Sequence, residues 1–268
     1  MATSSLHTAL KRNAKDVAIF LGIFGLLAYG MLWVLEQQSY DWQWHRLWRY
    51  VYIEHNGQYF AGPLLRGLFT TLEISAYAIV ISAIGGFLVA MMRASKLVTA
   101  RAIARIYIEV VRNIPILVLL FLIYFVLAPV FGLNRFWAGV ATLAIYEAAF
   151  AAEIYRSGIE AVPRGQKEAA KAIGLRPLQV MFHVVIPQSV PFILPAMTNL
   201  MINLVKHSAI VSVIAIFDLT NEGRNVIAET FMVFEVWFAV AGIYLVVTTL
   251  LSILASIIET RTKRFYAR

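Results

Sequence analysis

The stretch Leu68–Met92 reads LFTTLEISAYAIVISAIGGFLVAMM, and Glu73 is its one charged residue. A helix rises about 1.5 Å per residue, so roughly 20 apolar residues are enough to cross a hydrocarbon core about 30 Å thick. This stretch therefore predicts a transmembrane helix. A β-barrel would instead show short segments of alternating hydrophobicity, which the sequence lacks. The predicted fold class is all-α, a polytopic membrane helix bundle.

Further apolar runs raise the prediction to about six transmembrane helices. Composition agrees, since the chain is 60% hydrophobic and 14% charged, whereas a globular domain is roughly 45–50% apolar and about 25% charged. The apolar run nearest the N-terminus, Val17–Leu35, is longer than the roughly 7–15 residues of a signal-peptide core and precedes no small-x-small cleavage site. We therefore expect it to be an uncleaved span. The other predicted spans are Val17–Leu35, Ile106–Val130, Trp137–Ser157, Val190–Phe217 and Val236–Ile258.

Lysine and arginine are concentrated on one side of this predicted bundle. They lie before the first span, after the second, between the fourth and fifth, and after the last, whereas the remaining loops are mainly acidic. By the positive-inside rule the basic side, with both termini, is predicted to be cytoplasmic. The predicted parts are an N-terminal tail, extra helix and aromatic-rich extracytoplasmic loop (1–66), a transmembrane domain (67–260) with a cytoplasmic loop at 159–188, and a basic tail (261–268).

The same charge pattern argues against nucleic-acid binding. The net charge is +8, but a nucleic-acid-binding protein gathers its bases on one face, whereas these bases separate apolar runs. The chain has no cysteine, which excludes disulfides and thiolate metal sites. No spacing of His, Asp and Glu suggests a metal site. Trp and Tyr residues of the loop between Glu36 and Gly67 suit a membrane–water interface.

The cytoplasmic loop is more ordered than a simple connection. Its first half predicts a helix with Pro163 at the first position and Gly174 just past the end. A second short helix is expected from Pro177 to Pro187, with one apolar stripe formed by Leu178, Met181, Phe182 and Val185. Such a stripe can be buried against its own bundle, on the membrane surface or in another protein, and the residues alone leave these alternatives level.

Within this loop, Glu168-Ala169-Ala170, Gly174 and Val184-Val185-Ile186-Pro187 resemble the EAA motif of permease subunits of ATP-binding-cassette importers. In that family the loop docks in a groove of the cytoplasmic ATPase subunit. The resemblance therefore implies that this loop couples the bundle to an ATPase. The residues assigned to this coupling surface are Glu168, Ala169, Ala170, Gly174, Arg164, Leu178 and Phe182.

The resemblance extends over about Gly67–Leu219 and is to the polar amino-acid branch of these permeases. The first span and the aromatic loop lie outside it, as an addition to the five-helix core of that branch. The matching segments are Gly67–Ser75, Tyr107–Leu117, Ala152–Ile159 and Val162–Gln166.

The resemblance also implies partners. They are a dimer of ATP-binding-cassette ATPases, a second permease subunit (this chain or a paralogue), an extracytoplasmic solute-binding protein, an amino-acid substrate and membrane lipid. The chain has no phosphate-binding G-x-x-x-x-G-K-[ST] loop. We therefore expect ATP and Mg on the separate ATPase, and neither a cofactor nor enzymatic activity in this chain.

Polar residues inside the spans are the candidates for a substrate pathway. Asn199, Asn203 and Lys206 follow one another at helical spacing on the fifth span, and Glu147 lies near the middle of the fourth, where it could pair with Lys206. Ionisable side chains in a span cost roughly 2.5–3.5 kcal/mol each, so they usually face the bundle interior or a wet cavity. The predicted pathway residues are Lys206, Asn203, Asn199, Glu147, Arg112 and His207.

Interhelical hydrogen bonding is the competing role for these residues. It is favoured slightly for the asparagines and for His207, and the pathway slightly for Lys206. Arg112, beside Asn113 and a helix-kinking Pro115, could instead organise a helix start. Lys206 and Arg112 match positions common to the branch, so they do not identify the amino acid carried. The alternative function is an ion-coupled secondary transporter or channel, in which Glu147 or Lys206 would carry the coupling ion.

Overall fold

The computed structural model describes residues 15, 17–27, 29–30, 33, 40–55 and 57–266, in two compact units, residues 1–43 and 44–268. In the first unit Val17–Leu27 is an apolar helix. The rings of Phe20 and Phe24 stack on it, with centroids 6.5 Å apart. Part of the predicted first span, Val17–Leu35, lies outside the described residues, as do the bases at positions 11 and 12.

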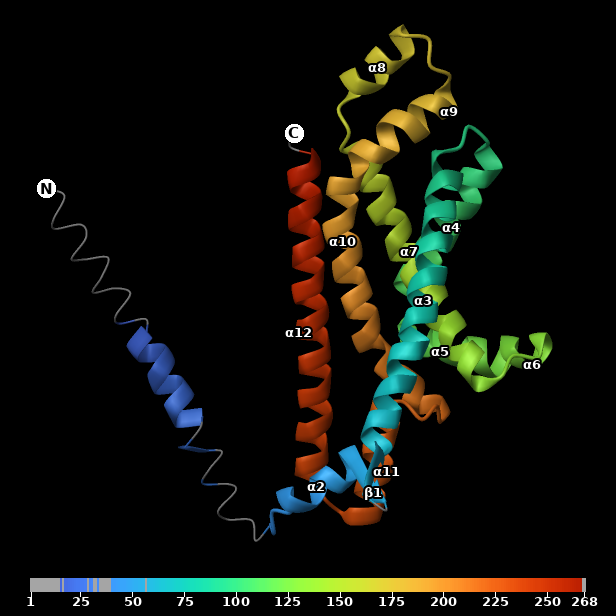
Figure 1. The fold of residues 1–268 in the computed structure, drawn as a ribbon. Coiled ribbons are helices and arrows are strands. Elements are labelled where there is room, and N and C mark those ends of the chain that lie inside the picture. Colours follow the sequence, from blue (N-terminus) through green and yellow to red (C-terminus); the bar gives the residue numbers. More distant parts are fainter. Residues whose placement is uncertain are drawn as a thin grey trace, which may run out of the picture. The chain divides into compact units, whose positions relative to one another are not determined.

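The second unit contains the helix bundle (Figure 1). Its elements, in chain order, are α2 Trp44–Val51, β1 Tyr52–His55, β2 Gln58–Ala61, α3 Pro63–Ala94, α4 Val98–Asn113, α5 Ile116–Phe121, η1 Leu122–Leu127, α6 Ala128–Phe131, α7 Arg135–Glu160, α8 Arg164–Ala172, α9 Pro177–Val180, η2 Met181–Val185, α10 Ile186–His207, η3 Ser208–Ile214, α11 Leu219–Thr230 and α12 Val233–Tyr266.

Four helical segments of the described residues are long and apolar enough to cross a membrane. They are Pro63–Ala94, Arg135–Glu160, Pro177–Ile214 and Val233–Thr262. Each contains or overlaps a predicted span, which confirms an α-helical protein that crosses the membrane several times. The count of six and the side on which the termini lie stay predictions.

The predicted third span, Ile106–Val130, is not one straight helix. It consists of α4 and the α5–η1–α6 segment, which meet at an angle of 109°, and the latter turns away from the bundle (Figure 1). Pro115 causes the break, because proline disfavours helical geometry in the preceding residue. Ile114 accordingly has extended backbone angles, φ −92° and ψ 130°.

The helix predicted to end at Pro187 instead continues into the next span. α9, η2 and α10 form one helical run, Pro177–Ile214. The π-helical turn of η2 closes with a bond from the Ile186 N–H to the Met181 carbonyl. This wider turn accommodates the ring of Pro187, so the expected separate short helix was wrong.

The preceding helix, α8, ends as predicted. Gly174 adopts φ +85°, which glycine reaches without steric cost. The N–H of Gly174 donates to the Lys171 carbonyl at 2.9 Å, and that of Leu175 to the Ala170 carbonyl at 3.2 Å. These two bonds form a Schellman motif. Leu175 packs on the cluster that contains Ala170, so it closes the last turn.

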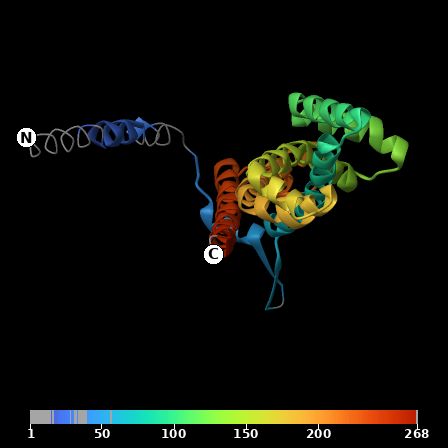
Figure 2. The same cartoon turned by 90° about the horizontal axis from the view of Figure 1, so that it is seen from above.

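The aromatic stretch predicted as a loop has regular structure. α2 precedes an antiparallel hairpin in which Tyr52 pairs with Ala61 and Glu54 with Tyr59. Figure 2 shows the hairpin projecting from the side of the bundle. Leu47, on α2, packs against a buried cluster formed by α3, α11 and α12. This packing stabilises a helix too short to be stable alone.

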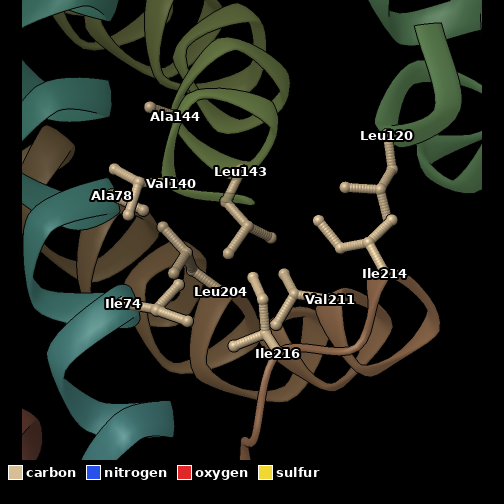
Figure 3. Close-up of a cluster of buried hydrophobic side chains, with 10 residues drawn as sticks. All are labelled: Ile74, Ala78, Leu120, Val140, Leu143, Ala144, Leu204, Val211, Ile214 and Ile216. Atoms are coloured by element: carbon tan, nitrogen blue, oxygen red, sulfur yellow. The ribbon is translucent and has the colours of Figure 1, made fainter. Parts of the chain in front are cut away.

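The main core lies where α3, α5, α7, α10 and η3 meet (Figure 3). Leu143 and Leu204, both fully buried, point toward each other in it. α3 and α7 approach closely because Gly86 has no side chain: a Cβ there would lie 2.5 Å from that of Ala151. Small residues at such crossings are characteristic of membrane helices.

At one end of the bundle, Asp218 caps α11. The carboxylate is fully buried and accepts the N–H groups of Asn221 at 3.0 Å and Thr220 at 3.3 Å. Burial raises the pKa of Asp218 from 3.8 to about 6, although these bonds oppose the shift. The folded protein therefore prefers the protonated acid more than the unfolded chain does.

Replacing Asp218 by asparagine should remove a pH-dependent loss of stability. Asparagine still caps the helix, but the wild-type protein carries a buried charge once the pH exceeds about 6. We expect Asp218→Asn to be more stable by at most about 3 kcal/mol at pH 7 and the two proteins to converge at pH 4. Thermal unfolding of the detergent-solubilised protein measures this, and a pH-independent difference would contradict it.

Candidate functional site

A cavity of about 610 Å³ opens between the end of α4 and the facing surfaces of α7 and α10. Its position follows from the fold, since α7 and α10 pack together and Pro115 ends α4 beside them. Its lining combines charged, amide and aromatic side chains. The lining residues are Arg112, Tyr146, Glu147, Phe150, Glu153, Ile154, Ala196, Asn199, Leu200, Asn203 and His207.

Glu147 is the buried acid of this cavity. Its side chain is 4% exposed, and Oε1 lies 2.7 Å from Nδ1 of His207 on α10. The partner of Glu147 is therefore His207, and the possible pair with Lys206 is not among the ion pairs of the described residues. The contact gives the buried carboxylate a hydrogen-bond partner, as a carboxylate among apolar helices requires. It also joins the two helices that form the walls of the cavity.

The polar residues predicted on the fifth span, which is now α10, do not all line the cavity. Asn199, Asn203 and His207, spaced four residues apart, all line the cavity and are exposed within the second unit. Lys206 is also exposed, but it is not one of the lining residues. The structure thus gathers the predicted pathway residues in one cavity, with Lys206 as the exception.

Arg112 approaches the cavity from the last turn of α4. The guanidinium carbon lies 5.2 Å from the centroid of the Phe150 ring, which is cation–π geometry. Arg112 therefore lies at a helix end rather than at a helix start. The next residue, Asn113, donates from its side-chain nitrogen to the Glu109 carbonyl at 2.6 Å. Pro115 thus places a cation at the cavity by ending the helix that carries it.

Sequence reasoning missed the apolar wall of the site. Phe150 and Ile154 lie three and seven residues after Glu147, so helical spacing from the buried acid could have found them. Glu153 also lines the cavity and forms ion pairs with Arg93 and Arg156. Glu153 is therefore a charged lining residue that is already paired with two arginines of this chain.

Between the end of α7 and the start of α10, residues 161–185 form a bend that we call the α8 corner. Within it Val162, Ala170, Val180 and Val185 make a buried cluster. The four residues of the predicted apolar stripe differ in burial. Val185 is buried and Met181 partly buried, whereas Leu178 and Phe182 are exposed. Exposed residues of the predicted coupling surface are Arg164, Glu168, Ala169, Gly174, Leu178 and Phe182.

The burial of these residues separates those that pack the α8 corner from those that form its surface. Ala170 lies inside the cluster, so it packs the corner and does not form part of its surface. Leu178 is 73% exposed and Phe182 55% exposed. A buried cluster under two large exposed apolar side chains gives a rigid surface suited to contact another molecule.

Comparison with known proteins agrees with this arrangement. The family described as "Binding-protein-dependent transport system inner membrane component" matches residues 82–264. "Probable glutamine ABC transporter permease protein GlnM" of Bacillus subtilis (strain 168) is 39% identical over 202 residues, covering 75% of this chain and 93% of that protein. "Octopine transport system permease protein OccM" of Rhizobium radiobacter is 32% identical and covers 73% and 84%, respectively.

A solved structure shows the same fold. It is described as the crystal structure of an amino acid ABC transporter with histidines, and it superposes with a TM-score of 0.69 at 41% sequence identity. The match covers 74% of this chain and 94% of that one. This chain therefore belongs to the family of inner-membrane components of binding-protein-dependent transport systems. It is a multi-pass permease of the inner membrane, and ATP hydrolysis lies in a separate subunit.

The Glu147–His207 contact can be tested by a double-mutant cycle. His207→Leu leaves a buried carboxylate without its partner, and we expect a loss of about 1–3 kcal/mol in stability. Adding Glu147→Leu should recover most of the loss, because an apolar pair can replace a buried polar pair at little cost. Thermal unfolding of the four proteins measures the coupling. Additive effects of the two substitutions would show that the contact contributes nothing.

Proposed function

We propose that the cavity between α7 and α10 carries an amino acid across the inner membrane and that the α8 corner transmits the force of a separate ATPase to it. One observation carries this proposal: α7 and α10, which form two walls of the cavity, both lead into the corner. α7 ends at Glu160, just before α8, and α9, η2 and α10 are one helical run. A displacement of the corner therefore moves both walls of the cavity.

The lining suits a zwitterionic substrate. Arg112 offers a cation for an α-carboxylate, and the second oxygen of Glu147 offers an acceptor for an α-ammonium group. The amides of Asn199 and Asn203 would then meet the side chain of the substrate. The names of the relatives, which refer to glutamine and octopine, support an amino acid or an amino-acid derivative.

The assembly proposed for this chain follows from its family. Two permease subunits, of this chain or of this chain and a paralogue, would enclose the path. A dimer of ATP-binding-cassette ATPases, with ATP and Mg, would contact the two α8 corners, and an extracytoplasmic solute-binding protein would deliver the amino acid. ATP-driven closure of the ATPases would favour the outward-facing state, because each state binds the partners differently.

An ion-coupled secondary transporter or channel is the alternative function. Transport by such a protein would need no ATPase, and Glu147 or Lys206 would carry the coupling ion. The match to a family of binding-protein-dependent systems supports the ATP-driven importer instead. In the alternative, no ATPase would cover the exposed apolar residues of the α8 corner.

The coupling surface can be tested by copurification of the ATPase. We expect Leu178→Ala with Phe182→Ala, or Glu168→Lys alone, to lower recovery of the ATPase at least about tenfold, because buried apolar anchors carry most interface energy. Phe192→Ala is the matched control, since Phe192 is exposed on the same helical run but outside the α8 corner. Copurification of no ATP-binding-cassette ATPase with the wild-type chain would refute the ATP-driven importer.

The cavity can be tested by uptake of radiolabelled glutamine in proteoliposomes that contain the whole complex. Asn203→Leu should reduce uptake about tenfold or more, because an exposed amide of the lining becomes apolar, while ATPase copurification stays unchanged. Lys206→Met tests whether the pathway continues beyond the lining, and loss of uptake with intact assembly is expected. Disassembly of the complex by either substitution would instead assign that residue to helix packing.

A further inference from the structure

Figure 1 shows α2 and the β1–β2 hairpin at the end of the bundle away from the α8 corner. A second hollow lies at that end. Its volume is about 840 Å³, and it opens between α2 and the β1–β2 hairpin, outside the residues matched by the family. We call it the α2 hollow. Its lining residues are Trp48, Arg49, Tyr52, Ile53, Glu54 and Tyr59.

The α2 hollow combines aromatic faces with one charge of each sign. Glu54 lies opposite Tyr59 in the hairpin, and Tyr52 is two residues earlier on the same strand, so these side chains share one face. Trp48 and Arg49 belong to α2. Within the described part of the chain, neither Arg49 nor Glu54 forms an ion pair. Both charges are therefore available to a ligand.

A wholly apolar groove adjoins the α2 hollow, and Trp48 lines both. This groove, which we call the α3–α12 groove, measures about 390 Å³ and runs between two membrane-spanning helices. A groove lined by apolar side chains between two helices of membrane-spanning length is suited to lipid tails rather than to water. Its lining residues are Leu47, Trp48, Val51, Leu65, Leu68, Ala239, Gly242, Ile243, Val246 and Val247.

We propose that the α2 hollow and the α3–α12 groove together bind one phospholipid of the phosphatidylethanolamine class, whose headgroup carries a phosphate and an ammonium group. Arg49 binds the phosphate through charge-assisted hydrogen bonds. Glu54 and the aromatic faces of Tyr52 and Tyr59 receive the ammonium group. An acyl chain lies in the α3–α12 groove, and Trp48 occupies the boundary between headgroup and chain, where tryptophan is enriched in membrane proteins.

The shape and charge of the site favour this occupant over others. A soluble protein or peptide could cover the α2 hollow, but it would leave the apolar groove between two helices of membrane-spanning length empty. A purely anionic headgroup would satisfy Arg49 but place its charge near Glu54, which is unfavourable. A zwitterionic lipid satisfies both charges and fills the groove.

The acyl-chain part of the site can be tested by filling the α3–α12 groove. A Cβ added at Gly242 meets no atom within 4 Å, so a larger side chain fits there without disturbing the helices. The matched control is Ala241→Phe, because Ala241 is the exposed neighbour on α12 that does not line the groove. The complete complex is reconstituted in bilayers of equal phosphatidylethanolamine and phosphatidylglycerol with identical chains. Retained lipid is then counted by native mass spectrometry.

We expect Gly242→Phe to reduce the retained phosphatidylethanolamine about tenfold, since the phenyl ring then occupies part of the groove that the acyl chain would fill, whereas Ala241→Phe leaves it unchanged. Arg49→Gln should lower retention by a similar factor, and Glu54→Gln should abolish the preference over phosphatidylglycerol. Arg224→Gln, an exposed arginine outside both hollows, is the headgroup control. Equal retention of the two lipids by the wild-type protein, or full retention by Gly242→Phe, overturns the proposal.

Discussion

The hydrocarbon core provides no hydrogen bonds, and this constraint explains most of the structure. Backbone groups must be paired within helices, and a polar side chain must find a partner or a wet cavity. In the part of the chain that the structure describes, every buried side-chain nitrogen and oxygen has a hydrogen-bond partner. Thr142 donates to a carbonyl one turn back in its own helix, whereas Glu147 reaches another helix to contact His207.

The breaks in the helices have a function in this arrangement. Pro115 ends α4 where Arg112 can enter the cavity, and it directs the following residues away from the bundle. Pro187 is instead absorbed by the π-helical turn η2, which keeps α9 and α10 in one run. Two prolines thus have opposite effects: Pro115 breaks a helix at the cavity, whereas Pro187 leaves the helical run from α9 to α10 continuous.

The two ends of the bundle have different roles. The α8 corner and the cavity lie within the part of the chain that matches the family, and the proposed transport role uses both of them. The α2 helix and the hairpin lie outside it and add an aromatic surface at the other end of α3 and α12.

Sequence alone determined the membrane-spanning helical class and the helix of the α8 corner with Gly174 at its end, and it singled out Glu147, Asn199 and Asn203 as polar residues within apolar spans. These features depend on local patterns: apolar run length, helix capping and polar residues in apolar runs. Only the tertiary structure decided that Glu147 contacts His207 and not Lys206, that Ala170 is buried and that α2 and the hairpin line a hollow. Those outcomes depend on how helices distant in sequence rotate and pack against one another, which no local pattern specifies.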